Sequence, residues 1–218
     1  MVQDVAHEAP RRWLTERQAE AVDQLVDAAE AEVEASGYDG LSVRNVARRA
    51  GVAPATAYTY FSSKDHLLAE LLWRNLATVP RSPTDPSAPL ADRVVQTVEE
   101  LGVIIGRSPA LVAACTQALL SSNPDVKGLR DRIGAEIRRR LGVAVGSDGD
   151  PEVVSVLLTT YFGAMLMAGM GHMTFDAVPG FVSNAARLMT SPDPSRATAN
   201  GTGNGKRNGT GNGKRRPR

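Results

Sequence analysis

Apolar residues recur at three- and four-residue steps along most of the 218-residue chain, which is the spacing of one face of an α-helix. The first run begins at a possible capping box, Thr15 with Gln18, and ends before Gly37, so it predicts a helix over residues 15–36. The same pattern predicts an all-α protein with further helices over residues 42–50, 54–60, 63–76, 92–105, 109–120, 124–141, 151–173 and 176–189.

The segment TAYTYF, residues 56–61, permits a second interpretation. Its β-branched and aromatic residues are also typical of a strand. No partner strand is predicted nearby, however, and Pro54 suits the first turn of a helix, where its missing N–H costs no hydrogen bond. We therefore interpret residues 54–60 as a helix.

Prolines and glycines divide the chain into parts. Four prolines make residues 79–89 a non-helical connector between a unit at 15–78 and a helical bundle at 90–190. The octapeptide NGTGNGKR occurs at residues 200–207 and again at 208–215, within a segment, 191–218, that is too polar to fold and is expected to be disordered. This tail is either simply solvated or attracted to nucleic-acid phosphates without sequence preference.

Charge is distributed unevenly. The whole chain has 25 Lys and Arg against 24 Asp and Glu, yet residues 192–218 hold seven bases and one acid. Residues 41–64 also lack any acid and contain Arg44, Arg48, Arg49 and Lys64. The predicted short helices at 42–50 and 54–60 therefore lie in a basic patch, which is typical of nucleic-acid contact.

The order of residues across these two short helices indicates a helix-turn-helix at about 42–61. Small Ala47 allows the helices to approach, and Gly51 allows a left-handed turn between them. The stretch LSVRNVARRAGVAPATAYTYFSSKDHLL, within residues 17–76, resembles the tetracycline-repressor (TetR) family of transcriptional regulators. Ala53-Pro54 and Ala57 depart from the usual pattern of that family, which leaves fewer polar contacts to bases.

The resemblance implies a role for each residue of this unit. Phe61, four residues after Ala57, belongs to the core. Side chains of the helix at 54–60 face base edges or thymine methyl groups. Phosphates are approached by side-chain hydroxyls, by the amine of Lys64 and by the N-terminus of the helix at 42–50. The expected DNA contacts are Ser42, Arg44, Pro54, Ala55, Thr56, Tyr58, Thr59, Tyr60 and Lys64.

The C-terminal half is expected to dimerise. Residues 153–173 contain no charged side chain and are long enough to span a membrane. The hydrophobicity of this segment is lowered by three hydroxyl side chains, Ser155, Thr159 and Thr160, and the helices on both sides are typical of a soluble bundle. We therefore interpret it as a helix buried in a bundle or against a second subunit. The family resemblance implies that the last two helices form a homodimer on a palindromic double-stranded DNA operator, with no membrane partner.

The resemblance also implies a small-molecule effector for this half. Few charges are predicted inside it, which favours an apolar or amphipathic molecule whose binding releases the DNA. The segment 107–130 is similar to regulators of lipid and steroid catabolism. Candidate effector contacts are Thr116, Gln117, Tyr161, Met165 and His172, although core packing or the dimer interface explains them equally well.

Several classes of function are disfavoured. Cys115 is the single cysteine, so it forms no internal disulfide, and it fits a buried position in a reducing, cytoplasmic compartment. No catalytic triad, phosphate-binding glycine loop or metal-ligand spacing occurs, so neither an enzyme nor a cofactor is expected. The alternatives to a ligand-controlled repressor are a dimeric DNA-binding protein without a ligand and an enzyme using the apolar C-terminal half.

Overall fold

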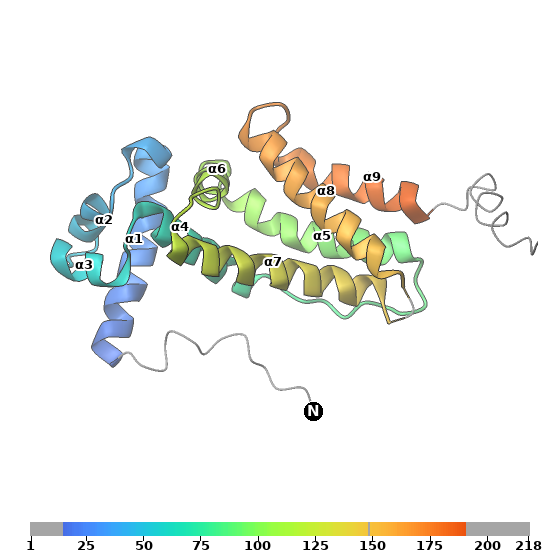
Figure 1. Ribbon diagram of the computed structural model, residues 1–218, viewed down its shortest axis with the longest axis horizontal. Coiled ribbons are helices and arrows are strands. Elements are labelled where there is room, and N and C mark those ends of the chain that lie inside the picture. The colour runs from blue at the N-terminus through green and yellow to red at the C-terminus, as the bar shows by residue number, and fades with distance from the viewer. Residues whose placement is uncertain (1–14, 148, 191–218) are drawn as a thin grey trace, which may run out of the picture.

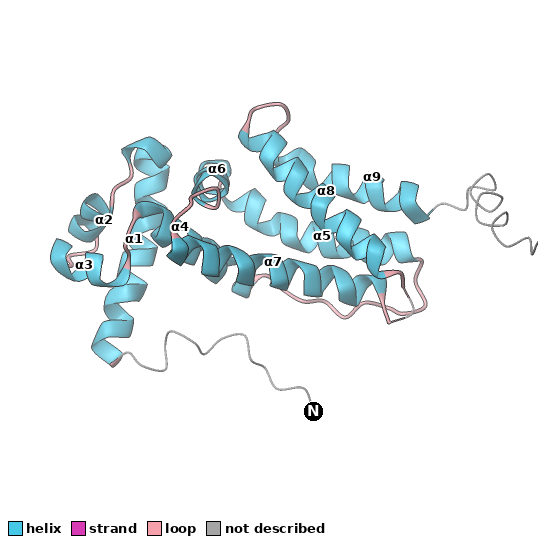
Figure 2. Ribbon diagram, in the orientation of Figure 1, coloured by secondary structure: helices cyan, strands magenta, loops and turns pink. Residues whose placement is uncertain are grey.

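The computed structural model describes residues 15–147 and 149–190. All regular secondary structure in these residues is helical, as predicted (Figure 2). The predicted disordered tail at 191–218 lies outside the described residues.

The N-terminal unit consists of four helices, α1 (Glu16–Gly40), α2 (Val43–Arg49), α3 (Pro54–Tyr60) and α4 (Lys64–Thr78). The predicted capping box begins α1, with Thr15 and Gln18 each accepting a hydrogen bond from the other's backbone N–H. Gly37 has φ 65° and interrupts α1 where the sequence predicts its end. The interpretation of residues 54–60 as a helix is confirmed by α3.

The C-terminal half contains α5 (Leu90–Arg107), α6 (Pro109–Ala118), α7 (Pro124–Val145), α8 (Pro151–Gly169), a short 3₁₀ helix (Phe175–Ala177) and α9 (Val178–Thr190). Helix α8 is shorter than predicted, because Met170 ends it and Gly171 follows in the left-handed region with φ 79°. In Figure 1, α1–α3 occupy one end of the molecule, α5, α7, α8 and α9 form a bundle at the other, and α4 and α6 lie between them.

Two hydrophobic cores hold these parts together. One lies in the C-terminal bundle and includes Trp73 and Leu76 of α4, and the other lies among α1–α4. Four residues of α6, however, belong to the N-terminal core: Leu111, Ala114, Cys115 and Ala118. Burial raises the pKa of the Cys115 thiol to about 12, so it is a neutral packing residue in this core. Helix α6 thus packs against α1 and α4, a placement that its sequence does not indicate.

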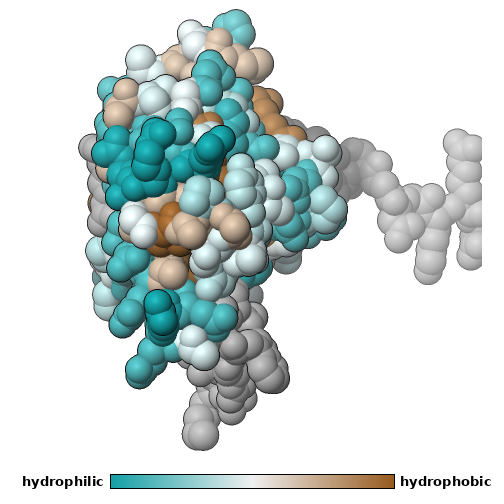
Figure 3. Space-filling model, turned by 90° about the vertical axis from the view of Figure 1, so that its left-hand side faces the viewer, coloured by the Kyte–Doolittle hydropathy of each residue, from teal (hydrophilic) through white to brown (hydrophobic). Residues whose placement is uncertain are grey.

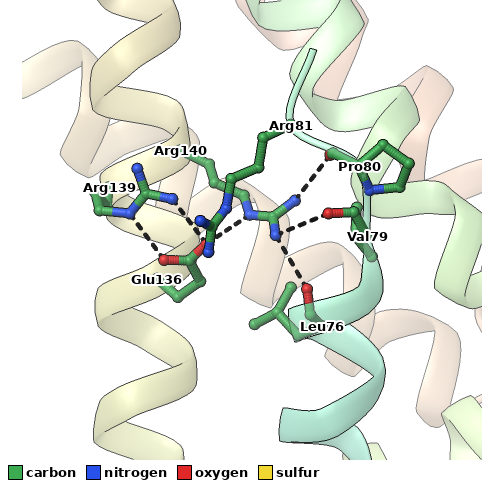
Figure 4. A network of polar contacts seen from close by, with 7 residues as sticks. All are labelled: Leu76, Val79, Pro80, Arg81, Glu136, Arg139 and Arg140. Atoms are coloured by element: carbon green, nitrogen blue, oxygen red, sulfur yellow. Dashed lines mark hydrogen bonds and ion pairs between the residues drawn. The ribbon is translucent and has the colours of Figure 1, made fainter. Parts of the chain in front are cut away.

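A buried arginine in the C-terminal part of α7 contacts the end of α4 (Figure 4). Arg140 is only 5% exposed, and its guanidinium donates hydrogen bonds to the carbonyl oxygens of Leu76, Val79 and Pro80 at 3.0–3.3 Å. It also donates to Glu136 at 2.8 Å. Backbone carbonyls at a helix end lack partners within the helix, so Arg140 provides donors for Leu76 in the last turn of α4 and for the two residues that follow this helix, while Glu136 neutralises its charge.

Glu136 is 7% exposed and accepts from three arginines, because Arg81 and Arg139 also reach its carboxylate, at 3.0 and 2.8 Å. Burial by itself would raise the pKa of this carboxyl. Hydrogen bonds from Arg139 and Arg140, with the positive charge of Arg81, outweigh that effect and lower the pKa to about 2. Ionised Glu136 is therefore a stabilising part of the fold.

We expect Glu136→Gln to lower the free energy of unfolding at pH 7 by roughly 2–4 kcal/mol, because it leaves Arg140 buried without a counter-charge. The pKa of Glu136 in the folded state, about 2, lies below its value of about 4.3 in the unfolded chain. The stabilisation by ionised Glu136 is therefore complete above about pH 4.3 and is lost as the pH falls toward 2. Urea unfolding at pH 7 and pH 3 measures both effects. Asp131→Asn, an exposed change on the same helix, is the matched control, and equal stability of the two variants would contradict the assignment.

Candidate nucleic-acid interface

Helices α2 and α3 pack closely around a glycine turn. Gly51 has φ 68°, a conformation that favours glycine, and the next N–H, of Val52, donates to the carbonyl oxygen of Ala47 at 2.9 Å. Ala47 and Ala57 are fully buried and allow the two helices to touch. Phe61, 3% exposed, completes the same core, which confirms its predicted core position.

The outer surface of α3 carries most of the side chains predicted to contact DNA. Pro54, Ala55, Tyr58 and Thr59 are exposed, and Tyr58 retains 53% of its accessible surface. Thr56 is half-buried, and its carbonyl oxygen accepts a hydrogen bond from the Thr59 hydroxyl at 2.6 Å. The structure therefore brings these residues together on one short, exposed helix.

Tyr60 lies differently from its neighbours. Its ring is half-buried and packs against the N-terminal core, and it lines a groove of about 610 Å³ between α1, α3, α4 and α7. Any DNA contact by Tyr60 must therefore use the exposed part of the ring or its hydroxyl.

Helix α2 contributes positive charge beside α3. Ser42 accepts the Asn45 N–H at 3.1 Å as the N-cap of α2, so its hydroxyl already serves the helix. Arg44 and Arg48 are exposed, whereas Arg49 pairs with Glu32 of α1 at 2.8 Å. Figure 3 shows that this end of the molecule is largely hydrophilic, with a small apolar patch within it. Arg48 was not among the predicted contacts, although the acid-free composition of residues 41–64 pointed to it.

Lys64 has an internal role that the sequence did not indicate. Its ammonium donates to the carbonyl oxygen of Tyr38 at 2.8 Å and lies 3.9 Å from the centre of that ring. Burial, together with the hydrogen bond that its hydroxyl donates to Asp65 at 2.7 Å, raises the pKa of Tyr38 to about 12. Lys64 thus ties α4 to the end of α1, and two of its three N–H donors remain for a phosphate.

The five predicted effector contacts differ in their burial and do not line a common pocket among the described residues. Gln117 and His172 are exposed, and the Thr116 hydroxyl donates to the carbonyl oxygen of Val112 at 2.8 Å. Tyr161 is buried in the C-terminal core, where burial raises its pKa to about 12, and Met165 packs partly against that core. None of the five lines the groove near Tyr60. Among the described residues, no cluster of three His, Cys, Asp or Glu side chains is suited to a metal ion.

Two short helices at a glycine turn, with an exposed second helix next to arginines, define a helix-turn-helix DNA-binding protein. Comparisons with known proteins agree. The family model described as "Bacterial regulatory proteins, tetR family" matches residues 25–71. An uncharacterized HTH-type transcriptional regulator of Mycobacterium tuberculosis is 42% identical over 190 residues, which cover 82% of this chain and 89% of that protein.

The HTH-type transcriptional repressor KstR of Mycolicibacterium smegmatis is 33% identical over 141 residues, 63% of this chain and 68% of that protein. Among solved structures, a TetR regulator from Rhodococcus sp. RHA1 has a TM-score of 0.67 at 21% identity, over 81% of this chain and 99% of that one. FadR of Bacillus subtilis, solved with stearoyl-CoA, has a TM-score of 0.60 at 18% identity, over 78% of this chain and 97% of that one. The chain belongs to the TetR family of DNA-binding transcriptional regulators.

Proposed function

We propose that this chain is a cytoplasmic, homodimeric repressor that binds a palindromic operator through α2 and α3 and is released by an apolar or amphipathic effector. In this proposal residues 15–78 bind DNA, and residues 79–89 connect them to the C-terminal domain. Residues 90–190 dimerise and bind the effector, and the tail at 191–218 is disordered. The proposal assigns no enzymatic activity. Its main support is the exposure of Tyr58 on α3 beside the exposed arginines of α2.

The DNA contacts follow from the exposed surface. Tyr58, Ala55 and Thr56 would reach base edges in the major groove, and Pro54 would bring the backbone at the start of α3 close to the bases. Ser42, Thr59, Tyr60 and Lys64 would approach phosphates, with Arg44 reaching either. Repression is supported by the name of the KstR relative, a transcriptional repressor.

A second copy of the chain is supported by an apolar surface on the last two helices. By length and composition α8 could cross a membrane, and only 28% of its most apolar 18-residue stretch is buried within the protomer. One side of α8 nevertheless packs into the C-terminal core, and α9, which packs against α8, also carries exposed apolar side chains. The large exposed apolar side chains on α8, its C-cap and α9 are Val156, Phe162, Leu166, Met167, Met170, Phe181 and Leu188. A surface shared by two helices suits a symmetric dimer better than a single membrane-spanning helix.

The dimer also has a geometric reason. Two recognition helices must be held about 34 Å apart to enter successive major grooves. A symmetric contact through α8 and α9, at the opposite end of the molecule from α3 (Figure 1), would place the two copies of α3 on one side of a palindromic duplex. Binding to a palindromic operator would therefore require both the apolar surface, which holds the two copies together, and the exposed recognition helix of each copy.

The effector proposal is supported by the structural neighbour FadR, which was solved with stearoyl-CoA. Such an amphipathic molecule would place its apolar chain in the C-terminal core near Tyr161 and Met165 and its polar end toward Thr116, Gln117 or His172. The ligand would release DNA if it binds more tightly to a conformation in which the recognition helices are misplaced. Without a ligand, the same fold would act as a constitutive DNA-binding dimer.

The DNA interface is tested by Tyr58→Ala and Lys64→Ala on an operator selected from random DNA by the wild-type chain. We expect Tyr58→Ala to weaken operator binding about tenfold or more while binding to scrambled DNA and the melting temperature change little, because Tyr58 is exposed. Lys64→Ala should weaken binding to both DNAs and reduce the salt slope by about 0.9. Fluorescence anisotropy across a salt series measures both. Unchanged operator affinity in Tyr58→Ala would remove this tyrosine from the interface.

The dimer is tested by Met167→Lys, which places an unpaired charge in the proposed interface. We expect the dimer dissociation constant to rise about a hundredfold or more, measured by analytical ultracentrifugation. Val143→Lys, at an exposed apolar position on α7, is the control and should remain dimeric. A dimer that is unaffected by Met167→Lys, or a wild-type chain that fractionates with membranes, would contradict the proposed interface.

The effector class is tested by adding stearoyl-CoA to the protein–operator complex, with free CoA as the control. We expect anisotropy of the labelled operator to fall with stearoyl-CoA and to remain constant with CoA, because the apolar chain provides the binding free energy. If neither compound changes the anisotropy or the melting temperature of the protein, long-chain acyl-CoA esters are excluded as effectors.

A further inference from the structure

The recognition helix α3 ends against the beginning of α7. Two residues after α3, the Ser62 hydroxyl donates to the Asp125 carboxylate at 2.6 Å. The Asn123 amide donates to Ser62 Oγ at 3.2 Å and to Ser63 Oγ at 3.3 Å. These hydrogen bonds join residues about 60 positions apart in the sequence, so α7 directly contacts the loop that terminates the recognition helix.

Both ends of this contact are built on fixed helix termini. Asn123 is the N-cap of α7, and its side-chain oxygen accepts the backbone N–H of Asp125 at 2.8 Å, which fixes the Asn123 side chain at the start of the helix. On the other side, Ser63 is the N-cap of α4 and accepts the His66 N–H at 3.1 Å. The contact therefore joins the first turns of two helices rather than two flexible side chains.

His66 extends the contact toward the core of the DNA-binding unit. Its Nδ1 lies 3.9 Å from Asp125 Oδ2 and 3.4 Å from the backbone nitrogen of Ser62. Its ring meets the edge of Phe61, the core residue that follows α3, with centroids 5.5 Å apart. A displacement of Asp125 would therefore displace His66 and, through it, Phe61, which holds the end of α3 in place.

Helix α4 is fixed to α7 at its other end as well. There the guanidinium of Arg140 binds the carbonyl oxygens of Leu76, Val79 and Pro80 (Figure 4). With Asn123 and Asp125 at one end and Arg140 at the other, α4 and α7 are held together along the length of α4. Because α7 also packs against α5 and α8, its position is set by the C-terminal bundle.

We propose that Asp125, with Asn123, is a positioning residue for DNA recognition that fixes the orientation of α3 relative to the C-terminal bundle. This inference rests on the proposed DNA interface of α3. Asp125 does not contact DNA in this proposal, and as an acid it would repel phosphate. Its removal should thus have two opposing effects: less repulsion of all DNA, and a less well oriented recognition helix on the operator alone.

The test compares Asp125→Ala with Asp131→Ala in the full-length chain. Both remove a carboxylate from α7, but Asp131 forms an exposed pair with Lys127 and does not reach the loop. Affinities are measured by anisotropy on the wild-type-selected operator and on scrambled DNA, with melting temperatures alongside. We expect Asp125→Ala to weaken operator binding at least fivefold and to leave scrambled binding within twofold of the wild type or slightly tighter, whereas Asp131→Ala changes neither by more than twofold.

Two further variants separate positioning from stability. Asp125→Asn keeps an oxygen that accepts from Ser62, so it should retain most of the operator affinity. Ser62→Ala should reproduce Asp125→Ala, and the double variant should be no weaker than either single one, because both remove the same hydrogen bond. Each readout is the ratio of the affinity for the operator to the affinity for scrambled DNA. A uniform loss of folded protein does not change this ratio.

The proposal is overturned if Asp125→Ala and Asp131→Ala have the same operator-to-scrambled ratio. It is also overturned if Asp125→Asn is as weak as Asp125→Ala, or if the effects of Ser62→Ala and Asp125→Ala simply add. A wild-type chain that enriches no DNA sequence would contradict the proposed interface itself, and that result is distinct from each of these.

Discussion

The arrangement of the whole molecule depends on the buried guanidinium of Arg140. A charge in this position is costly unless it is both paired and hydrogen-bonded, and it meets both conditions through Glu136 and the last carbonyl oxygens of α4. The chain leaves α4 immediately afterwards for the proline-rich connector, so the same contact determines how the bundle is placed on the DNA-binding unit. These polar contacts at the end of α4 therefore help to fix the angle between the two halves, together with the apolar packing of α4 against the bundle.

Helix α6 provides a second connection between the halves. Leu111 and Cys115 pack in the N-terminal core with α1 and α4, while the Thr116 side chain on the same helix lies near Gly169 of α8. Ser108, the N-cap of α6, also hydrogen-bonds to Glu34 of α1. A movement of α8 would therefore be transmitted through α6 to α1 and α4 by packed side chains, which deform little because protein interiors are close-packed.

The two exposed surfaces differ in chemistry as their proposed roles require. The surface at α2 and α3 combines arginines, hydroxyls and one exposed tyrosine, which suits the phosphates and base edges of DNA. The surface on α8 and α9 is apolar and lacks charged side chains over most of α8, which suits a partner of the same kind. Their location at opposite ends of the molecule allows both to be occupied at once.

The sequence by itself determined the helices, the helix-turn-helix and the core position of Phe61. Each depends on local signals: caps such as Thr15, prolines at helix starts and Gly51 at a left-handed turn. The end of α8 is predicted less well, because Gly163, Gly169 and Gly171 all lie in or next to this helix and the sequence does not show which of them adopts the left-handed conformation that ends it. Only the tertiary structure decided that α6 packs in the N-terminal core, that Lys64 binds Tyr38, and that Asp125 meets Ser62. The last two contacts join residues 26 and 63 positions apart, and a periodic pattern identifies which face of a helix is buried but not which helix will cover it.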